Sequence, residues 1–353
     1  MKRLILFLVL LSTWVYSVAQ EKTQCLFLVM TDGWRCDELF NGASDTLLAN
    51  APDLVKQQFG IGTPEERRKA LMPFMWTEIE SKGQIYGNRA YGNRVNLTNS
   101  YHFSYPGYSE IICGYADPQI NSNDKIDNPN VNVFEVLNNV PKFKNRVVAF
   151  GSWDPFPWIF NVKRNNLRVN AGYTCAEGNN LSTNEKLLNK LQFQIPGQFN
   201  GVRYDALTNA FAREYIKREK PRVVFLSFDE TDDIGHSGNY AAYLQAGYRF
   251  DQYLKELWTY INKDPFYKNR TTLIITTDHG RGHNNSWTGH GNKIQGSDQT
   301  WIAVIGPDTP VRGEVKQTEQ HYSNQIAKTI AAFLNVSYVP EKGCGEAIPE
   351  VFR

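Results

Sequence analysis

Three short apolar runs set the strongest constraint on how this chain can fold. They read CLFLVMT at 25–31, RVVFLSF at 222–228 and TLIITT at 272–277. Continuous apolar runs of this length are typical of strands buried on both faces, as in a parallel sheet. The sequence therefore predicts that these three segments lie inside one sheet.

Helical patterns lie between and after these runs. Residues 203–219, 239–261 and 322–334 repeat apolar side chains near the helical period. Strands that alternate with helices predict an α/β fold with a mostly parallel central sheet flanked by helices. The chain has 353 residues, 41% hydrophobic, which allows one large domain or two. Because the sequence contains no repeat, low-complexity run or linker, we expect a single domain over residues 20–353.

An aspartate follows each of the three predicted strands. These are Asp32, Asp229 with Asp232 close behind, and Asp278. In open α/β sheets, ligands bind beyond the carboxyl ends of the strands, so we expect the three acids to gather at one edge. An aspartate after a strand is also a common turn former and helix cap, so one acid alone decides nothing.

The N-terminus has the pattern of a secretory signal peptide. Two cations, Lys2 and Arg3, precede an apolar run from Leu4 to Val15 and a triplet of small residues. The run is too short to span a bilayer, so we expect cleavage after Ala19 and a secreted or periplasmic protein; an uncleaved anchor is the alternative. Cleavage lowers Lys+Arg from 38 to 36, against 36 Asp+Glu. A neutral mature protein argues against a nucleic-acid scaffold, and no later segment is apolar enough to cross a membrane.

The cysteines exclude two classes of protein. There are five of them and no CxxC pair, which argues against both a disulfide scaffold and a thiolate zinc site. One or two disulfides after export remain open, without a predicted pairing.

Two clusters carry residues suited to metal binding. The segment TTDHGRGHNNSWTGHGN (276–292) holds three of the six histidines. Asp278 and His279 are adjacent in it, and His290 follows near its end. In DETDDIGHSG (229–238), Asp232 and His236 are four residues apart, which brings both side chains to one face of a helix start.

Together with Asp32, these residues give six oxygen and nitrogen donors. Six donors suit two ions with three protein ligands each, which leaves positions open for water and substrate as in catalytic zinc sites. The same donors also accept Mn²⁺.

A nucleophile is expected in NSYHFSYPGYSEIICG (99–114). Ser104 precedes a Pro-Gly turn and a short apolar helix, so it lies at a helix N-terminus, where free N–H groups and the dipole favour an alkoxide or a phosphate oxygen. Ordinary N-capping explains the same placement. The two clusters favour the interpretation of Ser104 as a nucleophile. The GxSxG motif of hydrolases with a Ser-His-Asp triad is absent, so we expect a metal ion rather than a histidine to deprotonate the serine.

The order of these motifs resembles the alkaline phosphatase superfamily, most closely the type I phosphodiesterases, or nucleotide pyrophosphatases. The resemblance rests on VMTDGWR, FSYPGYSEIICG, DDIGH, TDHGRG and GHG and covers about residues 25 to 335. It implies a small phosphate-ester substrate, a phosphoserine intermediate on Ser104, and an asparagine that binds a phosphate oxygen. Asn121 and Asn123 are the candidates, and Asn123 is preferred. The zinc ligands that it implies are Asp232, His236 and His290 for one ion and Asp32, Asp278 and His279 for the other.

Some features differ from the type I phosphodiesterases. Their nucleophile is more often threonine, and the short interval between Asp278 and His290 is more similar to the mutase branches. The interval between Ser104 and Asp232 is nevertheless too short for the extra domain of phosphoglycerate mutases, and SYPGY lacks the arginine of the sulfatase motif. A sulfatase-like or mutase-like member is the alternative within the superfamily, and a catalytically dead metal- or carbohydrate-binding secreted protein is the alternative from another class.

Several other residues have both a functional and a structural interpretation. Arg35 could bind phosphate or form a surface ion pair, and His283 could replace His279, bind substrate or stand exposed in its loop. The remaining residues in this group are His102, next to the active site or on the surface; His321, expected to be structural; and the aromatic segment 152–160, a substrate wall or core.

Overall fold

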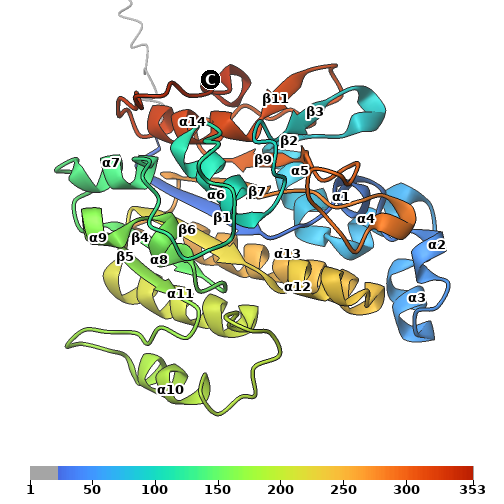
Figure 1. Cartoon of the computed structure of the whole chain (residues 1–353), viewed down its shortest axis with the longest axis horizontal. Helices are drawn as coiled ribbons and strands as arrows, with labels where there is room; N and C mark the ends of the chain where they lie inside the picture. The colour runs from blue at the N-terminus through green and yellow to red at the C-terminus, as the bar shows by residue number, and fades with distance from the viewer. Residues whose placement is uncertain (1–22, 353) are drawn as a thin grey trace, which may run out of the picture.

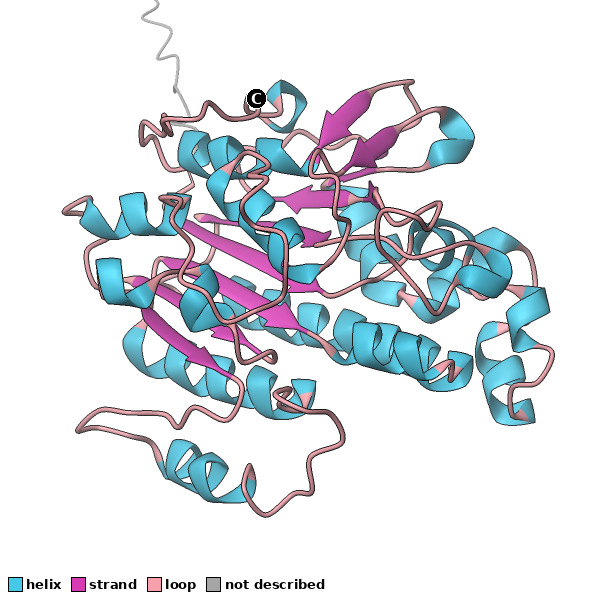
Figure 2. Ribbon diagram, in the orientation of Figure 1, coloured by secondary structure: helices cyan, strands magenta, loops and turns pink. Residues whose placement is uncertain are grey.

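The computed structural model describes residues 23–352, so the expected signal peptide at 1–19 lies outside the described residues. An eight-stranded sheet runs through the molecule, with helices on both faces (Figures 1 and 2). In spatial order its strands are β10 (Gly313–Glu314), β2 (Gln84–Tyr86), β9 (Ile302–Ile305), β7 (Thr271–Thr277), β1 (Cys25–Thr31), β6 (Val223–Phe228), β4 (Val147–Gly151) and β5 (Arg168–Ala171).

The sheet is mostly parallel, as the apolar runs predicted. Strands β7, β1, β6, β4 and β5 are parallel neighbours, and β9 pairs antiparallel with both β7 and β2. Every residue of β1, β6 and β7 is buried. The register places Thr31, at the end of β1, opposite Phe228 on one side and Thr277 on the other. The three strands therefore end level, and the aspartate after each begins at the same edge.

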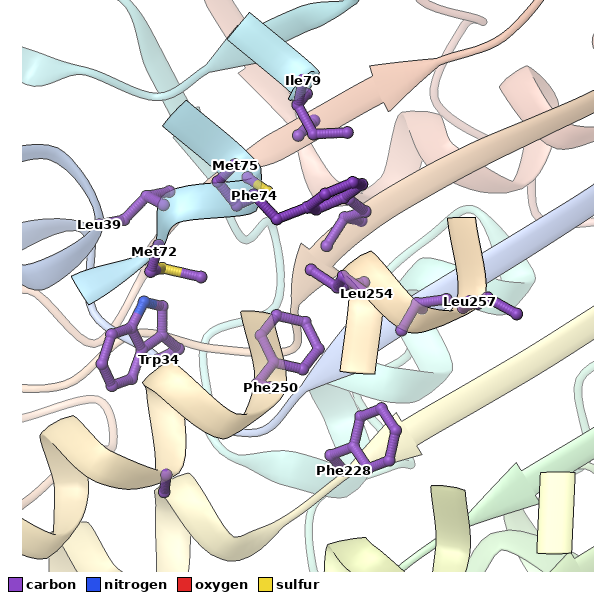
Figure 3. Close-up of a cluster of buried hydrophobic side chains, with 14 of the residues drawn as sticks. Trp34, Leu39, Met72, Phe74, Met75, Ile79, Phe228, Phe250, Leu254 and Leu257 are labelled. Carbon is purple, nitrogen blue, oxygen red and sulfur yellow. The ribbon is translucent and has the colours of Figure 1, made fainter. Parts of the chain in front are cut away.

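Two apolar cores lie on opposite faces of the sheet. Alternate side chains of β1 separate cleanly: Phe27 and Val29 belong to one core, and Leu26, Leu28 and Met30 to the other. The first core packs against α11 (Asp205–Glu219) and α13 (Tyr240–Lys263), and part of it is shown in Figure 3. The second packs against α6 (Ser104–Cys113), α7 (Val133–Asn139) and α14 (Ile326–Phe333).

Trp34 packs in the first core directly after the end of β1. It is fully buried and lies close to Gly247 in α13, where an added Cβ would stand 2.1 Å from Cη2 of the indole. Only glycine leaves room for this ring, so the helix is held tightly against the segment that follows β1.

The remaining elements surround this framework. A three-stranded sheet joins β11 (Gln320–Tyr322), β3 (Arg94–Asn96) and β8 (Gln299–Thr300). An excursion between β5 and α11 carries α10 (Thr183–Leu191), which projects at the lower end of the view in Figure 1. The other helices are α1 (Cys36–Asn41), α2 (Asp45–Leu48), α3 (Asp53–Phe59), α4 (Pro64–Leu71), the π-helical Met75–Ile79, α5 (Glu80–Lys82), α8 (Phe156–Ile159), α9 (Val162–Asn165) and α12 (Glu230–Ser237). Short 3₁₀ turns cover Arg89–Tyr91, Asn284–Ser286, Ser323–Gln325 and Pro349–Val351.

All five cysteines are free thiols, and Cys25, Cys36 and Cys113 are buried. The one or two disulfides that the sequence analysis allowed for an exported chain are therefore not formed in this structure. Within residues 23–352, none of the helices combines the length and the apolar character needed to cross a bilayer.

Candidate metal centre

Asp32, Asp278 and His279, which we call the inner set, meet at the carboxyl ends of β1 and β7. One ligand atom from each lies within 4.8 Å of the others, and all three side chains are buried. His279 Nε2 is 3.2 Å from Asp32 Oδ1 and 3.5 Å from Asp278 Oδ2. The predicted convergence of these three donors is therefore present in the fold.

The free atoms of the inner set fit a divalent cation. Asp32 Oδ1 and Asp278 Oδ2 are buried and accept no hydrogen bond, which is costly for a carboxylate unless a cation compensates. His279 Nδ1 lies 2.8 Å from the carbonyl oxygen of Gly280. Donation from Nδ1 leaves the Nε2 lone pair directed at the two carboxylates, the usual arrangement of a metal-binding imidazole.

The charges of the inner set support the same conclusion. Burial, together with the neighbouring Asp32 carboxylate, raises the pKa of Asp278 well above its usual range. Burial disfavours a charged imidazole, yet the facing Asp278 and Asp32 raise the pKa of His279 to about 10. Both shifts arise because two buried carboxylates lie close together and are stabilised by positive charge between them. A metal ion would supply that charge.

Asp232, His236 and His290, the outer set, lie beside the inner set. Asp232 and His236 project from α12, and His290 comes from the loop after β7. His236 Nε2 is 3.1 Å from Asp232 Oδ2 and 2.9 Å from His290 Nε2. His290 Nδ1 lies 3.2 Å from the carbonyl oxygen of His102, which orients the ring. Burial and the neighbouring His279 lower the pKa of His290 to about 3, so its nitrogen stays available as a ligand.

Arg281 is a member of this centre that sequence reasoning missed. Its guanidinium is buried and donates from Nη1 to Asp232 Oδ1, from Nε to the carbonyl oxygen of Trp287 (2.9 Å) and from Nη2 to that of Thr288. Burial alone would raise the pKa of Asp232, but Arg281 holds it well below its usual range. The arginine stands within the quoted motif TDHGRG, yet nothing in that motif indicates its partner 49 residues away.

Ser104 is the first residue of α6 and lies against the inner set. Its Oγ is 3.5 Å from His279 Nε2, and the residue is 6% exposed. The N-cap position belongs to Phe103 and has no side-chain cap, so capping does not explain the serine. Gly107 lets the helix approach this closely, because a Cβ there would lie 2.4 Å from the carbonyl oxygen of Asp278.

Two buried polar residues of α6 organise the site and were also missed. The Tyr108 hydroxyl donates to Asp32 Oδ2 (3.0 Å) and lies 2.8 Å from Ser227 Oγ. It thereby fixes the Asp32 carboxylate with Oδ1 left free. Glu110 accepts from the backbone N–H groups of Thr98 and Asn99, each at 2.8 Å, and so holds the loop that precedes Ser104.

Asp205 forms a third buried support. It accepts the Ser152 hydroxyl (2.6 Å) and the backbone N–H groups of Asp229 (2.9 Å) and Glu230 (3.2 Å), so it ties the end of β4 to the start of α12. Burial and the nearby Glu230 raise the pKa of Asp205 to about 8. It begins α11 in sequence, and only the tertiary structure places it beneath the outer set.

Asn123 lies next to the nucleophile candidate. Its carboxamide oxygen accepts from the backbone N–H of Tyr105, the residue after Ser104, at 2.9 Å. Both Asn121 and Asn123 are exposed, but this contact places Asn123 beside the serine. The amide nitrogen of Asn123 remains a donor for a substrate oxygen.

Arg35 forms an ion pair, which was one of its two predicted interpretations. It is buried rather than on the surface, and it donates to both carboxylate oxygens of Glu38 (2.7 and 2.9 Å) and to the carbonyl oxygen of Gly282. All of these acceptors are internal, so no phosphate is required to balance its charge. His283 likewise faces away from the inner set, with Nδ1 2.9 Å from Asp37 Oδ2.

The other residues that had two interpretations either support the candidate site or belong to the core. His102 adopts a left-handed backbone with φ +55° and contributes its carbonyl oxygen to His290. His321 is buried with its ring edge-on to Tyr86, in agreement with a structural role. In the aromatic segment, Phe156 and Phe160 fill the second core, whereas Trp153 is half-buried with its ring centroid 6.4 Å from that of Tyr108.

Known proteins resemble part of this chain in sequence and nearly all of it in fold. Residues 186–338 match the model of the metalloenzyme superfamily. No curated protein sequence matches the chain.

Three solved structures illustrate the likeness in fold. The lipoteichoic acid synthase LtaP from Listeria monocytogenes is 10% identical, with a TM-score of 0.59 over 94% of this chain and 76% of that one. The alkaline phosphatase PafA is 10% identical, with a TM-score of 0.59 over 94% of this chain and 99% of that one. A 2-O GAG sulfatase is 12% identical, with a TM-score of 0.52 over 94% and 74% of the two chains. These similarities confirm the α/β class and the mostly parallel sheet predicted from sequence.

Proposed function

Because the chain has the fold of the alkaline phosphatase superfamily, as its motifs predicted, and matches the metalloenzyme superfamily over residues 186–338, we propose that it is an exported two-metal phosphoric ester hydrolase. One observation carries the proposal. A buried serine hydroxyl with no capping role lies against a set of donors whose two carboxylate oxygens lack partners. Such a hydroxyl has the position of a nucleophile beside a metal ion.

In the reaction we propose, Ser104 Oγ forms a bond to phosphorus while the bond to the ester oxygen breaks. The leaving alcohol takes up a proton, and water then cleaves the phosphoserine and restores the hydroxyl. The ions, when bound, lower the pKa of the serine and stabilise the charge of the transition state. Asn123 donates its free amide N–H to a non-bridging phosphate oxygen, because its carbonyl oxygen is held by the backbone of Tyr105.

The charges of the centre favour a phosphodiester over a monoester. Two divalent ions, three ligand carboxylates and Arg281 leave two net positive charges. A serine alkoxide and a diester monoanion neutralise both, whereas a monoester dianion leaves an excess negative charge in a partly buried site, which is unfavourable. We therefore propose a phosphodiesterase that also accepts monoesters more slowly. Zinc is the ion that we propose, and Mn²⁺ suits the same ligands.

Ser104→Ala tests the nucleophile. We expect the variant to lose hydrolysis of bis(nitrophenyl) phosphate while it keeps about two bound ions per chain, the number that two three-ligand sets can hold. Ser109→Ala is the matched control, because Ser109 is a buried serine of the same helix that contacts Asn128 instead of the ligand sets. A Ser104→Ala variant with the turnover of the native chain would exclude this mechanism.

Substrate comparison separates the alternatives. EDTA should stop turnover and added zinc should restore it. Faster cleavage of nitrophenyl sulfate than of either phosphate ester would indicate the sulfatase-like alternative. A chain that holds both ions and cleaves none of these esters would instead be the dead, ligand-binding relative.

A further inference from the structure

The two ligand sets differ in burial and in charge. The inner set combines two carboxylates and one imidazole, and its side chains are at most 1% exposed. The outer set has one carboxylate and two imidazoles, and the His236 side chain is 48% exposed. Water therefore reaches the outer set far more easily than the inner set.

Arg281 increases the difference in charge. It donates to Asp232 Oδ1, so the one carboxylate of the outer set already has a cation as its partner. The inner carboxylates are different, because Asp32 Oδ1 and Asp278 Oδ2 accept no hydrogen bond from the described residues and face only the imidazole of their own set, His279.

The guanidinium of Arg281 cannot easily move away. Two backbone carbonyl oxygens, those of Trp287 and Thr288, anchor its other nitrogens. Gly235 lies against it so closely that an added Cβ would stand 2.8 Å from Cζ, and one at Gly33 would stand 3.1 Å from Nη1. The positive charge is thus built into the wall of the outer set.

We propose that Arg281 is a fixed counter-cation of Asp232 that weakens metal binding by the outer set, so that the outer ion exchanges with solvent while the inner ion stays. This inference rests on the ligand assignment of the proposed function. Two cations that share one carboxylate a few ångströms apart repel each other strongly in a partly buried site. We expect the outer ion to dissociate at least about tenfold faster than the inner one.

Chelator-induced release from the native chain is the first test. The protein is loaded with zinc, freed of excess metal and mixed with a chromogenic chelator, and the released zinc is followed over time. We expect one equivalent in a fast phase and a second in a slow phase. Release of both equivalents in a single phase would overturn the proposal.

Asp232→Asn assigns the phases. The substitution removes a ligand carboxylate from the outer set and none from the inner set, so the fast equivalent should be lost and the slow one kept. If the slow equivalent disappears and the fast one remains, the inner set is the labile one and the proposal is wrong.

Arg281→Met tests the cation itself. We expect the fast phase to slow by about tenfold or more when the charge is removed. Lys293→Met, which removes an exposed cation from the same loop, should leave both phases unchanged. An outer ion that leaves Arg281→Met as fast as or faster than the native chain would show that Arg281 only supports Asp232. If Arg281→Met fails to fold, Arg281→Gln replaces it, because the amide also removes the charge but can still donate to a carbonyl oxygen of the loop, and the same tenfold slowing is expected.

These measurements count ions and need no substrate. A chain with two release phases but no ester hydrolysis would refute the proposed function and leave the role of Arg281 intact. A chain that cleaves diesters but releases both ions together would do the reverse.

Discussion

Replacing Tyr108 by Phe removes one hydroxyl and keeps the ring that packs among Phe156 and Phe225. Asp32 Oδ2 loses its 3.0 Å hydrogen bond, and Ser227 Oγ loses a 2.8 Å contact. A hydrogen bond to a charged group contributes about 1.5–3 kcal/mol, so we expect unfolding in urea to cost that much less free energy. Without this bond the Asp32 carboxylate can rotate, and metal affinity of the inner set should fall about 10- to 100-fold.

The matched control is Tyr267→Phe. Tyr267 is also fully buried, but its hydroxyl donates to the carbonyl oxygen of Pro221 at 2.8 Å. We expect this control to lose about 1 kcal/mol of stability and none of its metal affinity. Competition for zinc with a chelating dye measures the affinities, and urea unfolding of the metal-free chains measures the stabilities. If Tyr108→Phe binds zinc as tightly as Tyr267→Phe, the hydroxyl does not position Asp32 and the reasoning fails.

Three further predictions concern other parts of the molecule. Gly247→Ala should lower the free energy of unfolding in urea, because forcing a Cβ to 2.1 Å from Trp34 costs about 1–3 kcal/mol or more while the gain in helix propensity is only about 1 kcal/mol; a raised urea midpoint would contradict this. Asn123→Ala should reduce diester hydrolysis about 100-fold with unchanged zinc content, and an unaltered rate would exclude the proposed phosphate contact. Burial raises the pKa of Asp251 to about 7, so the folded chain favours the protonated carboxyl. This preference adds to the free energy of unfolding fully below about pH 4, and the contribution is lost as the pH rises through 7. Relative to the native chain, Asp251→Asn should therefore gain up to about 4 kcal/mol in unfolding free energy between pH 4 and 8, and a difference that stays constant with pH would refute this.

The strands that build the site could be predicted because their signal is local. The runs 25–31, 222–228 and 272–277 correspond to β1, β6 and β7 within one residue at each end. A strand buried on both faces carries no charged side chains and no apolar-polar alternation, so its pattern can be recognised without knowledge of the neighbouring strands. The predicted helix at 322–334 was less accurate, because its first turn is 3₁₀ and α14 proper begins at Ile326.

The polar supports of the site could not be predicted, because each depends on a distant partner. Tyr108 meets Asp32 76 residues earlier in the chain, and Arg281 meets Asp232 49 residues earlier. Neither side chain differs in its local pattern from an ordinary core tyrosine or surface arginine. Arg35 is the opposite case, since its partner Glu38 is only three residues away and an ion pair was one of its predicted roles, but the sequence did not show that the pair is buried.

The level ends of β1, β6 and β7 also affect how the protein unfolds. The ligand residues come from positions as far apart as 32 and 290, and they meet only when all three strands are in register. An ion in the inner set needs β1 and β7, and an ion in the outer set needs α12 after β6 and the loop after β7, so two bound ions together stabilise only forms that keep all three strands. Bound ions should therefore suppress the partial openings that separate β1, β6 or β7, and proteases that cut through those local fluctuations should cleave the loaded chain more slowly than the metal-free chain.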